Sequence, residues 1–195
     1  MKRLFDCVVS LIILLCFLPF GILISIAIAL ESRGGVFYRQ ERVGQFGKPF
    51  RLWKFRTMRR NADKLGKLTV GMRDPRITRV GLFIRKVKLD EFPQFLNVLS
   101  GEMSIVGPRP EVQEYVDEYT EEQRQVLQVK PGITDYASLE YYHENELLGK
   151  SDNPRKTYIE EVMPAKIELN RKYLANPTIG HDLKIMWMTF VKMVK

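Results

Sequence analysis

One uncharged apolar segment constrains this chain more than any other feature. Residues 7 to 30 carry no charge, and they are bounded by Lys2 and Arg3 on one side and by Glu31 and Arg33 on the other. About 20 apolar residues are enough to span a bilayer, so the segment is long enough for a membrane helix. It exceeds the roughly 7 to 15 residues of a signal-peptide core, and no clear cleavage site follows it. We therefore expect a permanent membrane element.

The course of this element through the bilayer is open. Pro19 lies in its middle, where a proline removes a helical hydrogen bond and kinks the helix. Cations flank both ends, so the charge distribution does not select an orientation. A helix that enters, bends at Pro19 and returns to the same face would satisfy both ends. A simple span with a proline kink is the alternative, because membrane helices tolerate proline.

The formal net charge of +8 points to an anionic partner, which could be nucleic acid, a membrane surface or a phosphorylated ligand. The apolar N-terminus favours the last two, so we expect no nucleic-acid partner. The 195 residues suffice for one domain with a proper core. Both cysteines, Cys7 and Cys16, lie in the apolar segment, which argues against a disulfide framework and against a cysteine metal site.

The remaining patterns predict a mixed, helix-rich α/β fold. Residues 36–44 and 48–58 are rich in aromatic residues and cations around a Gly44–Gly47 turn, which predicts a basic β-hairpin. Residues 59–76 are polar and are expected to form a loop. Apolar spacing predicts helices at 78–87, 92–100, 111–129, 155–174 with a bend near Pro164, and 179–195. It predicts a strand at 103–106, and a turn at 133–142 that could lead into a strand.

The last predicted helix has two interpretations. Leu183, Met186, Trp187 and Phe190 share one face, and lysines lie off that face. An amphipathic helix of this kind suits a membrane surface. Packing against a protein core would produce the same pattern.

An acidic pair, Asp90-Glu91, follows Arg85 and Lys88 and precedes an apolar run. Taken alone, the pair could simply cap a helix and complement its dipole. Many arginines nearby in sequence favour a site for a phosphorylated substrate. One carboxylate could attack phosphorus, and the other could take a proton or hold Mg²⁺, which prefers one or two carboxylates together with substrate phosphates.

Three motifs resemble those of the bacterial sugar transferases, the small monotopic polyprenyl-phosphate phosphoglycosyltransferases. They are KFRTM at 54–58, RDPRITRVGLFIRKVKLDEFPQFLNVLSGEMSIVGPRPE at 73–111, and KPGIT at 130–134. The resemblance implies transfer of a sugar-1-phosphate from a UDP-sugar to undecaprenyl phosphate, with release of UMP. This would be the first membrane step in assembling an exopolysaccharide, capsule, O-antigen or glycoprotein glycan, and downstream glycosyltransferases would be further partners.

The resemblance also implies roles for individual residues. Asp90 would be the nucleophile that forms a covalent phosphosugar intermediate in a Mg²⁺-dependent ping-pong reaction. Glu91 would assist as metal ligand or base, so both members of the pair are candidate metal ligands. The membrane helix would be re-entrant and broken at Pro19. Contacts to the diphosphate and nucleotide would fall on Lys54, Arg56, Arg85 and Arg109.

The resemblance further implies a membrane helix at 1–34 and a catalytic domain with interfacial helices at 35–195, on the cytoplasmic face of the bacterial inner membrane. By its length the chain is expected to hold little more than that catalytic domain. Many members continue after PGIT with GLAQV and a basic segment, whereas this chain reads DYASLEYYHENE, so the sugar stays unnamed. Two alternatives remain: transfer of a different phosphoryl group to a lipid, and a membrane-anchored basic protein that binds nucleic acid or anionic lipid without catalysis.

Overall fold

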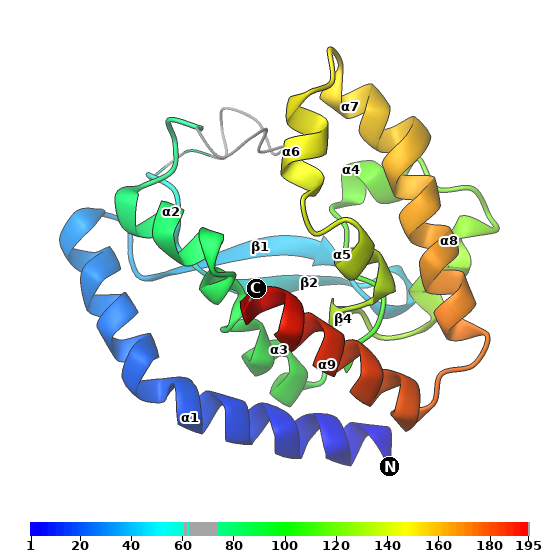
Figure 1. The fold of residues 1–195 in the computed structure, drawn as a ribbon, viewed down its shortest axis with the longest axis horizontal. Coiled ribbons are helices and arrows are strands. Elements are labelled where there is room, and N and C mark those ends of the chain that lie inside the picture. Colours follow the sequence, from blue (N-terminus) through cyan, green and yellow to red (C-terminus); the bar gives the residue numbers. More distant parts are fainter. Residues whose placement is uncertain (61, 63–73, 195) are drawn as a thin grey trace.

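The computed structural model describes residues 1–60, 62 and 74–194. Most of the predicted polar loop at 59–76 lies outside the described residues, and so does Arg73 at the start of the long motif. The chain begins with helix α1 (Lys2–Glu31), which is long and apolar enough to cross a membrane. One side of its apolar stretch is exposed, and the other is partly buried against the rest of the protein. The expected break at Pro19 is not an interruption of the helix, because α1 continues through this residue. Its two halves nevertheless run in different directions along the edge of the fold (Figure 1).

The N-terminal half of α1 is bound to the rest of the protein by polar contacts. Arg3 donates from its guanidinium to the carbonyls of Val98 and Leu99. Asp6 is only 3% exposed, and its carboxylate accepts from the Ser104 hydroxyl at 2.7 Å and from the Ile105 amide at 3.4 Å. A buried charge needs such partners, so this end of α1 has a fixed position on the protein.

The C-terminal end of α1 is bound as well. The Glu31 carboxylate accepts from the amides of Arg79 and Val80, at 2.7 and 2.8 Å. These amides begin helix α2 (Arg79–Lys86) and have no acceptor within that helix. Both ends of the apolar helix are therefore attached to the same globular body.

Two small sheets form the centre of that body. Strands β1 (Phe37–Val43) and β2 (Pro49–Phe55) pair antiparallel and are joined by the short helix η1 (Gln45–Gly47). Strands β3 (Ser104–Val106) and β4 (Gly132–Thr134) pair in parallel. The buried Asn97 satisfies the edge of β2, because its side chain accepts from the Trp53 amide and donates to the Arg51 carbonyl, both at 2.9 Å.

Helices surround these sheets and make the fold a helix-rich α/β structure (Figure 1). Helix α1 lies along α3 (Gln94–Ser100), and α8 (Met163–Leu174) packs against α5 (Tyr136–Glu140). The remaining helical elements are η3 (Leu89–Glu91), α3 (Gln94–Ser100), α4 (Gln113–Val116), η4 (Gln123–Gln128), α5 (Tyr136–Glu140), α6 (Glu144–Gly149), α7 (Pro154–Thr157), η5 (Tyr158–Val162), α8 (Met163–Leu174) and α9 (Ile179–Val194).

The predicted helix at 111–129 is wrong. Only α4 and η4 form there, and a turn separates them. Thr120 and Gln123 account for the restart, because each side chain accepts from the other residue's backbone amide, at 3.2 and 2.9 Å. Such reciprocal capping begins a new helical segment, and periodicity alone does not reveal it.

Two other predictions need refinement. The segment at 133–142 holds only the end of β4, and α5 begins directly after Asp135, whose carboxylate caps it. Residues 154–174 are helical throughout, but η5 is a π-helical stretch placed just before Pro164. A π turn shifts the hydrogen-bond pattern where proline cannot donate.

The apolar face of α9 is exposed. Leu183, Trp187 and Phe190 are 51%, 66% and 59% exposed, whereas Ile185 on another face is completely buried. Leu183, Trp187 and Phe190 therefore do not pack in the protein core, whereas Met186 of the same predicted face is partly buried against it. Such exposed apolar surface is compatible with a membrane-surface helix, which stays a prediction.

Candidate active site

The acidic pair lies in η3, at the junction between α2 and α3. The Thr78 hydroxyl caps α2 by accepting from the Gly81 amide at 2.9 Å. Lys88 then adopts the left-handed conformation, with φ at 57°, and turns the chain into η3. Pro93 follows at the start of α3, where a missing amide proton has no cost. Capping and backbone geometry thus direct Asp90 and Glu91 into the protein.

Glu91 is held by two cations from distant segments. Arg109 donates to both of its carboxylate oxygens, at 2.5 and 2.8 Å, and Lys54 Nζ lies 3.3 Å from Oε1. Burial alone would raise the pKa of Glu91, but Arg109 and then Lys54 outweigh it and hold the pKa well below its usual value. Glu91 is therefore a fixed anion that positions two cations.

Asp90 has a different environment. It is 8% exposed, and burial, followed by the charge of Glu91, raises its pKa, although Lys54, Arg85 and Lys88 oppose this. Burial likewise lowers the pKa of the Lys54 ammonium group despite the nearby carboxylates. Two adjacent carboxylates with pKa values shifted in opposite directions are typical of a catalytic site, where they serve different roles.

The loop that carries Arg109 is anchored to β4 and to the cap of α5. Its amide donates to the Asp135 carboxylate at 3.2 Å, and its guanidinium also donates to the Ile133 carbonyl at 3.1 Å. Gly107 and Gly132 allow the loop to approach, since a Cβ on Gly132 would lie 2.2 Å from the Gly107 nitrogen. Close backbone contact thus fixes Arg109 opposite Glu91.

The structure brings together most of the residues predicted for the site. Lys54 and Arg109 contact Glu91. Arg85 donates to the Thr57 hydroxyl at 2.8 Å, and its charge opposes the rise in the pKa of Asp90. Arg56 is elsewhere. Its guanidinium donates to the carbonyls of Gly35 and Phe37, at 2.8 and 3.2 Å, and fastens the connection after α1.

Sequence reasoning missed several residues around the pair. The ring of Tyr142 lies 4.9 Å from the Lys88 ammonium and 5.4 Å from that of Lys192 in α9. Asp135 helps to position Arg109, because its carboxylate accepts from the backbone amide of Arg109. Lys88 could have been suspected because it lies two positions before Asp90. No sequence signal connects Tyr142 or Lys192 to the pair.

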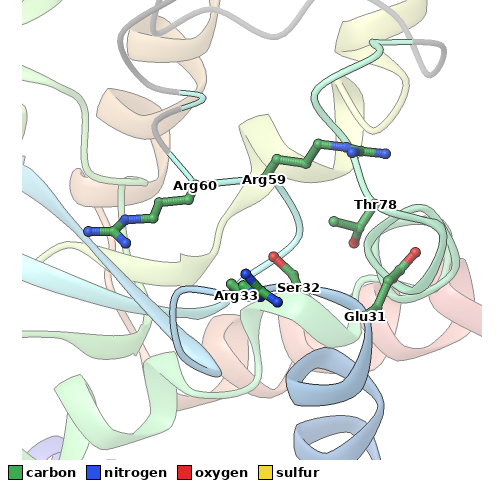
Figure 2. A pocket seen from close by; sticks show the side chains of 6 residues that line it. All are labelled: Glu31, Ser32, Arg33, Arg59, Arg60 and Thr78. Atoms are coloured by element: carbon green, nitrogen blue, oxygen red, sulfur yellow. The ribbon is translucent and has the colours of Figure 1, made fainter.

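A separate cavity of about 220 Å³ opens at the junction of α1 and α2. It is lined by Glu31, Ser32, Arg33, Arg59, Arg60 and Thr78. Figure 2 shows that Arg59 and Arg60 extend in different directions, so these side chains do not converge on one point. The acidic pair does not line this cavity.

Metal binding at the acidic pair would depend on additional ligands. Within the described part of the chain, no cluster of three or more His, Cys, Asp or Glu side chains could hold a metal ion. Asp90 and Glu91 supply carboxylate oxygens, and Mg²⁺ is often held by one or two of these together with substrate phosphates. The donor set fits that arrangement, although Arg109 and Lys54 already occupy the oxygens of Glu91.

Comparison with known proteins identifies relatives of the whole chain. A UDP-glucose:undecaprenyl-phosphate glucose-1-phosphate transferase of Escherichia coli is 37% identical over 98% of this chain and 40% of its own length. An uncharacterized sugar transferase of Bacillus subtilis is 40% identical over 100% of this chain and 87% of its own.

A third relative, from Aeromonas hydrophila, is a UDP-N-acetylgalactosamine-undecaprenyl-phosphate N-acetylgalactosaminephosphotransferase, 35% identical over 96% of this chain and 42% of its own. The chain thus spans about 40% of the length of the Escherichia coli and Aeromonas relatives. The profile of the bacterial sugar transferases matches residues 1–195, and the chain belongs to the bacterial sugar transferase family.

Proposed function

We propose that this protein transfers a sugar-1-phosphate from a UDP-sugar to undecaprenyl phosphate and releases UMP. The observation that carries the proposal is the division within the acidic pair: Glu91 is locked by Arg109 and Lys54, while Asp90 is buried with a raised pKa. Relatives named for this reaction with UDP-glucose and UDP-N-acetylgalactosamine support the donor and acceptor classes.

Asp90 would act as the nucleophile. Its carboxylate attacks the phosphorus that carries the sugar, a P–O bond forms, and the bond from that phosphorus to the bridging oxygen breaks, so that UMP leaves with the electron pair. The phosphate of the polyprenyl acceptor then attacks the same phosphorus and releases the Asp90 carboxylate. A raised pKa suits this role, because a more basic carboxylate is the better nucleophile once ionised.

Glu91 would organise the cations of the site. It holds Arg109 and Lys54 beside Asp90, where they can bind the diphosphate and stabilise the charge that develops on UMP. Arg85, fixed by Thr57, adds a third cation close to Asp90. We expect Mg²⁺ to be held by Asp90 or Glu91 with the substrate phosphates, and when bound it would neutralise phosphate charge.

The attachments of α1 support a re-entrant course. Arg3 and Asp6 bind the body at one end of the helix, and Glu31 binds it at the other. A helix crossing a hydrocarbon core of about 30 Å would place its ends on opposite sides, where one body could not bind both. We therefore propose that α1 enters the membrane, bends near Pro19 and returns, with the catalytic part on the cytoplasmic face.

UMP release by the protein in nanodiscs with undecaprenyl phosphate, Mg²⁺ and a panel of UDP-sugars tests the reaction. Asp90→Asn should abolish release and prevent a covalent phosphosugar adduct detectable by mass spectrometry. Asp152→Asn, an exposed matched change, should leave both intact. Substantial turnover by the Asp90 variant would overturn the assignment of the nucleophile. A membrane-anchored protein without catalysis would release no UMP from any donor.

The topology has its own test. In sealed vesicles, protease should reach tags fused to the N-terminus and to the C-terminus from the same side if α1 returns. Protection of only one of the two tags would instead indicate a spanning helix.

A further inference from the structure

A second group of cations lies beside the acidic pair and is unused by the mechanism above. The Tyr142 ring has the Lys88 ammonium 4.9 Å and the Lys192 ammonium 5.4 Å from its centroid. Both distances lie within the range of a cation–π interaction, which is about 6 Å. The three residues come from the α2–η3 junction, the segment after α5, and α9, so the fold assembles the group from separate parts of the chain.

The group faces the catalytic pair. Lys88 acts on the charges of both Asp90 and Glu91, and Glu91, after burial, contributes to raising the pKa of the Tyr142 phenol. Lys192 of α9 reaches the same ring and donates to the Leu139 carbonyl. Lys88 therefore joins this group to the acidic pair, since it lies two positions before Asp90 and contacts the Tyr142 ring.

The backbone at Lys88 is unusual for a lysine. Its φ of 57° places it in the left-handed region, which residues with a side chain rarely adopt. Strain of this kind is retained when the surrounding structure requires it, and it is concentrated at functional sites. Lys88 directly precedes η3, and from this position its ammonium group contacts the ring of Tyr142.

In the described segments neither Lys88 nor Lys192 forms an ion pair with a carboxylate, and the ammonium group of Lys192 donates instead to the Leu139 carbonyl. Lys54, Arg85, Lys88 and Arg109 act electrostatically on the acidic pair, and Lys192 adds a fifth cation on the Tyr142 ring, whereas Asp135 and Glu144 also act on Arg109. A local excess of positive charge attracts an anionic ligand.

We propose that Lys88 and Lys192, held by the ring of Tyr142, form a second arm that binds the phosphates of the nucleotide-sugar donor. The inference rests on the proposed function and names residues that bind its donor. Arg109 and Lys54 would hold the diphosphate from the side of Glu91, and this arm would hold it from the side of α9. The alternative is that Tyr142 only joins α9 to the core, in which case its loss would affect stability but not donor affinity.

Lys192→Gln provides the decisive comparison, with Lys184→Gln as its matched control. Lys184 lies on the same helix and is exposed, so the control removes an equal charge at a distance from Tyr142. We expect Lys192→Gln to raise the KM for the UDP-sugar about tenfold, the size expected for losing one charged partner of a phosphate. The KM for undecaprenyl phosphate should stay within about twofold, and Lys192→Arg should restore most of the donor affinity.

Tyr142 has a graded test of its own. Tyr142→Phe keeps the aromatic ring and should bind donor almost as the parent does, whereas Tyr142→Leu should weaken donor binding severalfold. Equal donor KM values for the Lys192→Gln and Lys184→Gln variants, or equal values for the Phe and Leu variants, would overturn the proposal.

Binding of UDP by isothermal titration to the Asp90→Asn protein separates this inference from the proposed reaction. Weaker UDP binding by Asp90→Asn/Lys192→Gln than by Asp90→Asn/Lys184→Gln would support the arm even if no UMP were released from any donor. Equal UDP binding by the two, with UMP release by the parent protein, would leave the reaction standing and remove the arm.

Discussion

Replacing Arg109 with methionine tests how the site is held together. The change removes two charged hydrogen bonds to Glu91, at 2.5 and 2.8 Å, and leaves its carboxylate with Lys54 at 3.3 Å. Removing one partner of a buried pair costs about 3 to 5 kcal/mol, because the other charge stays buried. The Arg109 and Glu91 side chains are 28% and 18% exposed, and Lys54 remains, so we expect the lower end, about 3 kcal/mol.

For a protein of this size such a loss corresponds to a fall in Tm of about 6 to 12 °C. Thermal unfolding in detergent, followed by tryptophan fluorescence at pH 7, measures it. Arg155→Met is the control, since Arg155 pairs with Glu114 on the surface with side chains 56% and 42% exposed. An exposed pair contributes about 0 to 1 kcal/mol, so this control should hardly change Tm.

The pH dependence of this difference has a definite sign. Arg109 and Lys54 outweigh burial and hold the pKa of Glu91 well below its usual value of 4.5. A carboxylate with a lowered folded-state pKa contributes stability above its unfolded value, and this contribution is lost as the pH falls through the folded value. The Tm values of the parent and Arg109→Met should therefore converge on acidification below 4.5. A difference that stayed constant, or one no larger than that of the control, would refute the argument.

Three further changes test other parts of the structure. Gly81→Ala would place a Cβ 2.1 Å from the Thr57 carbonyl oxygen, so unfolding measurements should show a loss of about 1 to 3 kcal/mol, whereas Gly180→Ala, with its nearest contact at 3.9 Å, should be nearly neutral. Asp6→Ala leaves two buried donors on β3 unsatisfied and should cost about 2 kcal/mol in the same assay, with Asp6→Asn losing less. Burial, and then the charge of Glu91, raise the pKa of Asp90 above its usual value of 3.8. The value of kcat/KM for UMP release should therefore rise with pH around a pKa above 3.8, and a kcat/KM that stayed constant down to pH 4 would contradict this.

Local patterns predicted the helices that flank the acidic pair, because apolar spacing depends on neighbours only three or four residues away. They failed at 111–129, where the apolar spacing is helical but the reciprocal capping of Thr120 and Gln123 starts a new helical segment. They also missed the π-helical stretch before Pro164, since the same residue types suit a bent α-helix. In both cases hydrogen bonds that composition does not encode decided the backbone.

The candidate site shows a different limit. Arg56 and Arg109 are equivalent as charges in the sequence, yet Arg56 is bound by two backbone carbonyls and Arg109 by Glu91. Which cation meets the carboxylate depends on contacts across 18 and 37 residues for Arg109 and Lys54. Motif likeness selected both arginines, and tertiary structure separated them.

Lys192 extends this argument to the membrane. It lies near the end of α9, whose apolar face is exposed at Trp187 and Phe190, and its ammonium group contacts Tyr142 beside the acidic pair. At the other end of α9, Asp182 forms an ion pair at 2.5 Å with Lys2 of the apolar helix α1. One helix thus connects an exposed apolar surface, the N-terminal end of α1 and the proposed donor arm. The reaction we propose joins a water-soluble donor to a lipid acceptor at Asp90, and α9 is placed to couple the two.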